Sequence, residues 1–182
     1  YPSNDGSPEL LDAISKWVNK RYGVILNPEK QILSLNGTRE GLFNAQIALS
    51  PETKNGKPTK VLIPNPFYQV YAVGAATVSA EPVFVPAYAE NNFMPNYSEL
   101  PKEVLDQTTI LFLCSPANPQ GTLATYEYWV ELQSDFSHFR ASRSLHSRPS
   151  KACCLYLYRN RKRTPSRRKS MSRFICWGTH SR

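Results

Sequence analysis

Leu113-Cys114-Ser115-Pro116-Ala117-Asn118-Pro119-Gln120-Gly121-Thr122-Leu123 is the stretch of sequence that decides the fold. The apolar residues 110–113 lead into it and predict a short strand that is buried on both faces. Pro116 ends that strand, because proline has no N–H to donate to a neighbouring strand. Asn118 then lies beyond the carboxyl end of the strand, which is where doubly wound sheets bind ligands. An Asn-Pro-x-Gly sequence is by itself also typical of an ordinary turn, so the rest of the chain has to decide.

Strand and helix patterns alternate upstream of this turn. A helix is predicted from Pro8, because Ser7 can cap it and apolar residues then recur at helical spacing until Gly23. The other predicted helices cover residues 39–49, which follow a tight turn at 36–38, a stretch entered after 64–71, part of 97–104, and 125–132. The predicted strands cover 31–35, 60–63, 81–85 and 109–113, and a polar loop covers 51–60. This alternation predicts an α/β fold, a mainly parallel sheet with right-handed crossovers and helices on both faces.

The charge of the chain is divided unevenly. The 182 residues carry a formal net charge of +8, yet residues 1–133 hold 9 Lys and Arg against 13 Asp and Glu, whereas residues 134–182 hold 13 against 1. Net charges of −4 and +12 mark two different kinds of sequence. We therefore predict a folded domain over residues 1–133 and a basic, irregular and disordered tail over residues 134–182.

Composition also indicates the cellular compartment of the protein. The sequence has no apolar run long enough for a transmembrane helix and no charged-then-apolar segment typical of a secretory signal. The chain contains four cysteines, and without a secretory signal the default setting is a reducing compartment. We expect a cytoplasmic protein with no membrane partner.

Three turns at the ends of predicted strands would face one crevice. Gly37-Thr38-Arg39 begins a helix, where backbone N–H groups, a hydroxyl and a guanidinium can bind a phosphate, although plain helix capping explains the same residues. Tyr68 could cover a flat ligand ring, or could simply cover the edge of the core. Asn118 supplies an amide that both donates and accepts hydrogen bonds. In combination, the three turns predict a site for a small phosphorylated aromatic ring.

Two segments carry a resemblance to a known family. Residues 63–71, Ile-Pro-Asn-Pro-Phe-Tyr-Gln-Val-Tyr, and residues 112–121, Phe-Leu-Cys-Ser-Pro-Ala-Asn-Pro-Gln-Gly, resemble the class I and II pyridoxal-phosphate aminotransferases of fold type I. The sequences of these two segments are similar to those of the bacterial succinyldiaminopimelate aminotransferases, and the resemblance extends over residues 1–132. It implies a partial large domain of that fold, pyridoxal 5'-phosphate as cofactor, and transfer of an amino group between an amino acid such as succinyldiaminopimelate and a 2-oxo acid.

The resemblance also implies roles for particular residues. Thr38 and Arg39 would hold the cofactor phosphate, and Gly37 would allow the backbone to approach it. Tyr68 would stack on the pyridine ring, and Asn118 would hydrogen-bond the ring oxygen.

The same resemblance implies an assembly for intact relatives. They would be homodimers with shared sites, in which the residue matching Tyr1 reaches the phosphate bound by the neighbouring subunit. Small-molecule amino acids and 2-oxo acids would be their substrates.

Two groups that the family needs for catalysis cannot be matched. In the family a lysine forms a Schiff base with the cofactor and an aspartate pairs with the pyridinium nitrogen, both downstream of the Asn-Pro-x-Gly turn. The sequence contains no Asp-x-x-Tyr motif, and Ser150-Lys151 follows Gly121 too closely to leave room for the intervening strands. Lys162 and Lys169 have still less of the expected context. No catalytic residue is therefore identified, and we expect the 182-residue chain to be inactive.

Three accounts of residues 134–182 remain. We favour a shifted reading frame or a broken gene, because the change in composition is abrupt and the hydrophobic pattern disappears. The alternative is a basic arm that binds nucleic acid through runs such as residues 159–169, which would make the chain a non-catalytic adaptor. The third account is a metal site, for which no Cys-x-x-Cys spacing gives support; it would use Cys153, Cys154, Cys176, His146 and His180. We expect no metal.

Overall fold

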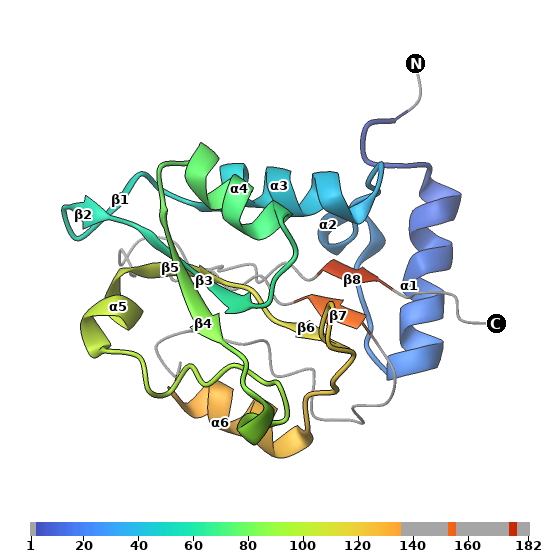
Figure 1. The fold of residues 1–182 in the computed structure, drawn as a ribbon. Helices are drawn as coiled ribbons and strands as arrows, with labels where there is room; N and C mark the ends of the chain where they lie inside the picture. The colour runs from blue at the N-terminus through green and yellow to red at the C-terminus, as the bar shows by residue number, and fades with distance from the viewer. Residues whose placement is uncertain (1–2, 136–152, 156–174, 178–182) are drawn as a thin grey trace.

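A three-stranded parallel sheet forms the centre of the molecule (Figure 1). The computed structural model describes residues 3–135, 153–155 and 175–177. The strand order is β4-β3-β5, so that β3 pairs with both neighbours. The strands are β3 (Lys60–Asn65), β4 (Glu81–Pro86) and β5 (Thr108–Leu111). Sequence analysis predicted each of them, and the parallel sheet is confirmed.

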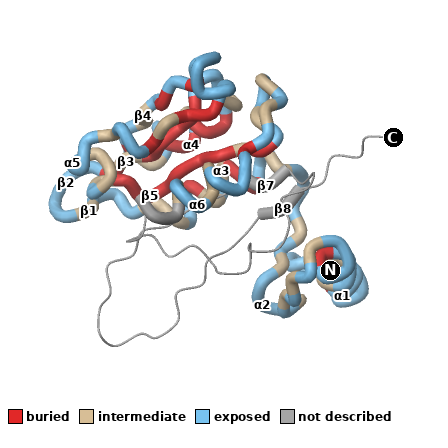
Figure 2. The backbone as a smooth tube through the Cα atoms, turned by 90° about the horizontal axis from the view of Figure 1, so that it is seen from below, coloured by how far each residue is buried: buried red, intermediate tan, exposed pale blue. Residues whose placement is uncertain are grey.

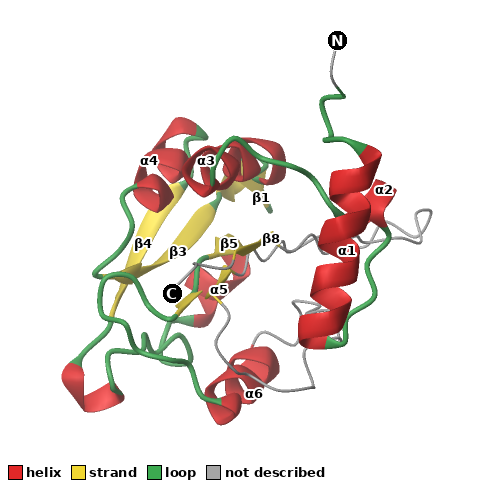
Figure 3. Cartoon of the chain, turned by 90° about the vertical axis from the view of Figure 1, so that its right-hand side faces the viewer, coloured by secondary structure: helices red, strands yellow, loops and turns green. Residues whose placement is uncertain are grey.

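Helices cover both faces of this sheet (Figure 3). Successive side chains of a strand point to opposite faces, so Val61 and Ile63 enter one core and Leu62 enters the other. The first core lies under α3 (Thr38–Leu49) and α4 (Val70–Thr77), and the second lies against α5 (Lys102–Gln107) and α6 (Tyr126–Asp135). All three strand residues are fully buried. The predicted arrangement of helices on both faces is confirmed.

Two further helices lie to one side of the sheet. They are α1 (Pro8–Tyr22) and α2 (Pro28–Gln31), which are mostly exposed, whereas burial concentrates in β3, β5 and α4 (Figure 2). The hydroxyl of Ser7 accepts a hydrogen bond from the Leu10 N–H at 3.3 Å, and Gly23 ends α1 at a φ of 68°. The first predicted helix therefore has both of its predicted ends.

The predicted strand over residues 31–35 is wrong. Gln31 is the last residue of α2, and Ile32 is extended, with φ −119° and ψ 137°, but belongs to no strand. An extended segment becomes a strand only beside a partner, and within the described part of the chain this one pairs with none. The N–H of Ser34 instead donates to the carbonyl of Asp5 at 3.3 Å.

The predicted polar loop over residues 51–60 contains a small hairpin. Its strands are β1 (Thr53–Lys54) and β2 (Lys57–Pro58), which pair antiparallel. Asn55 and Gly56 join them with positive φ values of 58° and 74°. An Asn-Gly pair is a common two-residue hairpin turn, so the sequence did carry the signal for this element.

The end of the third central strand also differs from the prediction. The strand predicted over residues 109–113 ends early, because β5 covers Thr108–Leu111; β6 (Cys114–Ser115) is a separate strand beyond the predicted range. β6 pairs antiparallel with β7 (Cys153–Leu155), which pairs with β8 (Ile175–Trp177). These last two strands lie in the region for which the sequence predicted no regular structure. The rest of that prediction, residues 136–152, 156–174 and 178–182, lies outside the described residues.

Two short helical elements complete the described chain. η1 (Ala89–Asn91) is a single 3₁₀ turn after β4, and α5 begins within the predicted range 97–104 and extends beyond it to Gln107. No helix in the described ranges is long and apolar enough to cross a membrane.

Candidate functional site

The start of α3 presents backbone N–H groups at one edge of the molecule. Gly37 has no side chain with which to cap the helix, and its φ of 125° lies in the region that favours glycine. A Cβ built on Gly37 would meet no atom within 4 Å, so the backbone conformation, and not a lack of space, requires glycine here. Thr38 is the first residue of the helix. An uncapped helix start that faces open space is suited to bind an anion.

Arg39 joins this helix start to the next predicted turn. Its Nε donates a hydrogen bond to the hydroxyl of Tyr68 at 2.7 Å, and its Cζ lies 5.6 Å from the centroid of the tyrosine ring. The hydrogen bond with Tyr68 raises the pKa of the Arg39 guanidinium, and an arginine is in any case charged at physiological pH. Two of the three predicted turns thus meet, 29 residues apart in the sequence.

Aromatic contacts connect Tyr68 to the core. Its ring meets the edge of Tyr71 at 5.9 Å between centroids and 89° between planes. Tyr71 in turn stacks on Phe112 at 4.2 Å and 13°. Both of these partners are buried, so the half-buried Tyr68 is held by a rigid support. Offset and edge-to-face contacts of this kind restrain ring orientation.

The third predicted turn closes on itself. The Ala117 N–H donates to the Thr122 carbonyl and the Gly121 N–H donates to the Ala117 carbonyl, both at 2.7 Å. Asn118 is exposed at the tip of this turn. The turn therefore holds Asn118 on an ordered backbone beyond the end of the sheet.

Asn118 approaches the second turn across a small cavity. It lines this cavity together with Pro66 and Tyr71, and the volume is about 10 Å³, which is room for one water molecule. Gln120 lines the same cavity, and its Oε1 is buried without a hydrogen-bond partner within the described part of the chain. The first turn therefore meets the second through Arg39 and Tyr68, and the second and third turns line one small cavity through Pro66 and Asn118.

The donor set fits a pyridoxal phosphate in part. The uncapped start of α3 and the charged Arg39 suit a phosphate, and the Tyr68 ring and the Asn118 amide suit a polar aromatic ring. The unpaired oxygen of Gln120 is a further buried polar group that a ligand or a water could satisfy. Tyr1, Lys151, Lys162 and Lys169 lie outside the described residues.

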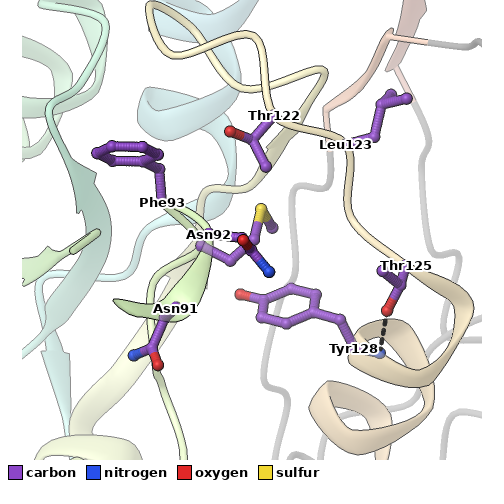
Figure 4. A pocket seen from close by; sticks show the side chains of 8 residues that line it. Asn91, Asn92, Phe93, Thr122, Leu123, Thr125 and Tyr128 are labelled. Carbon is purple, nitrogen blue, oxygen red and sulfur yellow. Dashed lines mark hydrogen bonds between the residues drawn. The ribbon is translucent and has the colours of Figure 1, made fainter. Parts of the chain in front are cut away.

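A larger cavity lies next to this site (Figure 4). Its volume is about 380 Å³, and none of the predicted site residues lines it. It shares Phe93 and Met94 with the small cavity that Asn118 lines. Its walls combine amides, hydroxyls and apolar side chains, namely Asn91, Asn92, Phe93, Met94, Thr122, Leu123, Thr125 and Tyr128. Sequence analysis missed it, and the adjacent asparagines indicated at most a turn.

Two tyrosines of the second core, of which Tyr128 also lines that cavity, donate hydrogen bonds to backbone carbonyls. Tyr128 donates to the Pro95 carbonyl at 2.8 Å, and Tyr97 donates to the Phe112 carbonyl at 2.7 Å. Burial raises the pKa of both hydroxyls, that of Tyr97 well above its ordinary value. Both side chains are therefore neutral donors and not candidate bases.

No metal centre is found in the part of the chain that the structure describes, because no group of three or more His, Cys, Asp or Glu side chains comes together there. His146 and His180 lie outside the described residues. The tail cysteines belong to β7 and β8, and their side chains are likewise not described.

Comparison with protein families gives a match over most of the chain. The profile described as "Aminotransferase class I and II" matches residues 1–137. The LL-diaminopimelate aminotransferase of Dehalococcoides mccartyi is 36% identical over 132 residues, which are 72% of this chain and 32% of that protein. LL-diaminopimelate aminotransferase 2 of Trichormus variabilis is 37% identical over 133 residues, 72% of this chain and 33% of that protein. The chain thus spans about a third of the length of the curated relatives it matches.

Solved structures give the same picture. An aminotransferase from Neisseria meningitidis superposes with a TM-score of 0.68 at 32% identity, covering 75% of this chain and 34% of that one. Substrate-bound BacF from Bacillus subtilis gives 0.68 at 28% identity, with the same coverage. The aromatic aminotransferase of Pyrococcus horikoshii gives 0.66 at 32% identity, covering 74% of this chain and 34% of that one.

Proposed function

Because this chain belongs to the class I and II aminotransferases, a family that depends on pyridoxal phosphate, we propose that residues 3–135 carry part of a site for that cofactor. The complete protein would transfer an amino group between an amino acid and a 2-oxo acid. One observation carries this proposal: Arg39, at the start of α3, donates its Nε–H to Tyr68. The helix start that would bind the phosphate and the aromatic that would cover the ring are thereby next to each other.

The chain's own residues would bind and orient the cofactor. Thr38 and the charged Arg39 would hold the phosphate, with the positive φ of Gly37 aiming the backbone N–H groups at it. Tyr68 would lie on the ring, and Asn118 would hydrogen-bond the ring oxygen. Pyridoxal phosphate, when bound, supplies a ring that accepts the electron pair of the substrate carbanion.

We propose a substrate with the diaminopimelate skeleton. The sequence of residues 63–71 and 112–121 favours succinylated diaminopimelate as the substrate, whereas the relatives described above are named for LL-diaminopimelate. The two differ in whether the second amino group is acylated. Initial rates of the complete protein with both donors would separate them, and a preference for the unmodified diamine would remove the succinyl assignment.

We propose a homodimer for the complete protein, with Tyr1 reaching the phosphate of the neighbouring subunit. Support comes from the family pattern at the N-terminus. Sedimentation of the complete protein, compared with a Tyr1→Phe variant, tests this. The dimer should persist in the variant while cofactor affinity falls.

The 182-residue chain itself should not catalyse transamination. Its sequence offers no lysine and no aspartate at the positions that the family pattern requires. The assay is turnover of diaminopimelate and 2-oxoglutarate with added pyridoxal phosphate, and measurable turnover would overturn this proposal.

The charge of residues 134–182 favours a second candidate, an adaptor that binds nucleic acid. Thirteen basic residues against one acidic residue would neutralise several phosphates. Binding should then weaken steeply with salt and should disappear when residues 134–182 are removed. Sequencing the encoding DNA in all frames decides between this reading and a frame shift. If another reading frame restores Asp-x-x-Tyr and a later Ser-Lys pair, the adaptor function is excluded.

Direct titration of the 182-residue chain tests the cofactor site. Pyridoxal phosphate should bind weakly and reversibly, and Arg39→Ala should weaken it about tenfold, the effect of losing one charge-assisted hydrogen bond. A Lys57→Ala control, in the hairpin, should leave the affinity unchanged. Equal affinities of the wild type and Arg39→Ala would contradict the proposed site.

A further inference from the structure

Gln46 is a fully buried polar side chain inside the first core. It lies in the third turn of α3, and its exposed fraction is 0%. Glutamine is seldom buried to this degree in proteins. Its place among Leu42 and the apolar residues of β3 and α4 therefore needs a reason.

The amide of Gln46 links α3 to the start of α4. Its Nε2 donates a hydrogen bond to the carbonyl of Val70, the first residue of α4, at 3.1 Å. Gly74 makes room for it, because a Cβ at Gly74 would lie 1.9 Å from the same nitrogen. The two helices thus approach each other only because one carries glycine where the other carries a glutamine amide.

This link is not optimised for stability. The Oε1 of Gln46 is buried and has no hydrogen-bond partner within the described part of the chain. A buried acceptor left unpaired costs about 1–3 kcal/mol. An apolar side chain of the same length would avoid that cost, so stability alone does not explain a glutamine here.

The position of the Gln46–Val70 hydrogen bond explains the presence of glutamine better than stability does. Tyr68 lies two residues before Val70, and Arg39 lies seven residues before Gln46 on the same helix, about 10 Å along its axis. A hydrogen bond from α3 to the first carbonyl of α4 fixes where α4 starts. It therefore also fixes where the tyrosine just upstream of α4 meets the arginine at the start of α3.

We propose that Gln46 is a positioning residue: its hydrogen bond to Val70 places Tyr68 where the Arg39 Nε–H can reach the tyrosine hydroxyl. Only the consequence for pyridoxal phosphate rests on the proposed function. The placement of Tyr68 does not.

The first test measures the Arg39–Tyr68 contact without any ligand. Gln46→Met keeps the volume and removes the donor. Proton exchange at the Arg39 Nε–H, followed by NMR and assigned with Arg39→Lys, should be slow in the wild type and on the order of tenfold faster in Gln46→Met, as expected for one lost hydrogen bond. Unchanged exchange in this variant would overturn the proposal, as would rapid exchange in the wild type.

A matched control separates positioning from general loosening. Tyr97→Phe also removes one buried hydrogen bond to a main-chain carbonyl, but in the second core. It should destabilise the chain to a comparable degree and leave the Arg39 exchange rate unchanged. If Tyr97→Phe accelerates the exchange as much as Gln46→Met does, the proposal is wrong.

A second variant covers the case in which Gln46→Met does not fold. Gly74→Ala places a methyl group where the Gln46 amide lies, and should accelerate the Arg39 exchange as Gln46→Met does. Unchanged exchange in folded Gly74→Ala would contradict the proposal.

Titrations with two ligands extend the test to the cofactor. Pyridoxal phosphate should bind Gln46→Met about tenfold more weakly than the wild type, whereas inorganic phosphate, which does not need the tyrosine ring, should bind both about equally. Failure of pyridoxal phosphate to bind the wild type would contradict the proposed function and leave the exchange result standing. An equal loss for both ligands would overturn the role assigned to Tyr68 placement.

Discussion

The two faces of the sheet each bury a polar side chain, but they use it differently. On the α5 and α6 face, the hydroxyl of Tyr97 donates a hydrogen bond to the carbonyl of Phe112. On the α3 and α4 face, Gln46 uses one end of its amide and leaves the other unpaired. The first arrangement stabilises the segment that follows β5, whereas the second connects α3, whose first turn carries Arg39, with α4, which begins two residues after Tyr68. The buried amide on the α3 and α4 face therefore links two helices, whereas the buried hydroxyl on the α5 and α6 face does not.

The largest effect should come from removing a core aromatic. Phe112→Ala should lower the free energy of unfolding by about 3–5 kcal/mol, because the side chain is fully buried. It should also loosen Tyr68 through the Tyr71 stack. Leu113→Ala, in the other core, should cost about 2–5 kcal/mol and leave the Arg39 contact intact. Denaturant unfolding and the Arg39 exchange rate measure the two effects, and equal loosening by both variants would erase the distinction between the faces.

Glycine replacement should separate backbone strain from ligand binding. Gly37→Ala should cost about 1–3 kcal/mol, because its φ of 125° is unfavourable for alanine. Gly56→Ala, in the hairpin at φ 74°, is the matched control, since neither site has atoms within 4 Å of the added Cβ. Only Gly37→Ala should weaken the binding of inorganic phosphate. If both variants bind phosphate as the wild type does, the start of α3 is not the anion site.

The α5 and α6 face should dominate the response to alkaline pH. Burial raises the pKa of Tyr97 and Tyr128 above the ordinary value of 10.0. The stability that these neutral hydroxyls contribute is fully present below pH 10 and is lost as the pH rises towards their folded-state pKa values. Each group contributes a slope of up to about 1.4 kcal/mol per pH unit in that range.

The variant that checks this slope is Tyr128→Phe. Its free energy of unfolding should fall less steeply than that of the wild type between pH 10 and pH 11. An identical slope in both proteins would show that Tyr128 is not perturbed as described.

The smallest effect should come from the exposed contact itself. Tyr68→Phe removes the hydroxyl that Arg39 binds, at a partly exposed position, and should change the free energy of unfolding by less than about 0.5 kcal/mol. Its effect should instead be a loss of protection at the Arg39 Nε–H. A large loss of stability would mean that the contact serves the fold and not the site.

The sequence predicted those features that depend on local chemistry. Ser7 before Pro8 and Gly23 marked the ends of α1, and continuous apolar runs marked the three parallel strands. Strand pairing, in contrast, depends on a neighbouring strand and not on local sequence. Residues 32–35 have extended propensity but no partner in the described part of the chain, so the predicted strand there did not form.

The sequence could not reveal features that depend on packing between distant segments. Gln46 reads as an ordinary polar position of a helix, and only its distance to Val70 and Gly74 identifies it as a link. The larger cavity likewise forms between η1 and the turn after Asn118, which are far apart in the sequence. By contrast, sequence analysis predicted both Arg39 and Tyr68 as site residues, although nothing in the sequence indicated their direct contact.

The central claim is that the start of α3 and Tyr68 form the phosphate and ring ends of one site. Isothermal titration of the 182-residue chain and of Tyr68→Ala, with pyridoxal phosphate and with inorganic phosphate, tests it most directly. The claim predicts that Tyr68→Ala weakens the binding of pyridoxal phosphate and leaves that of inorganic phosphate unchanged. Equal binding of pyridoxal phosphate by both proteins, or no binding by the wild type, would contradict it.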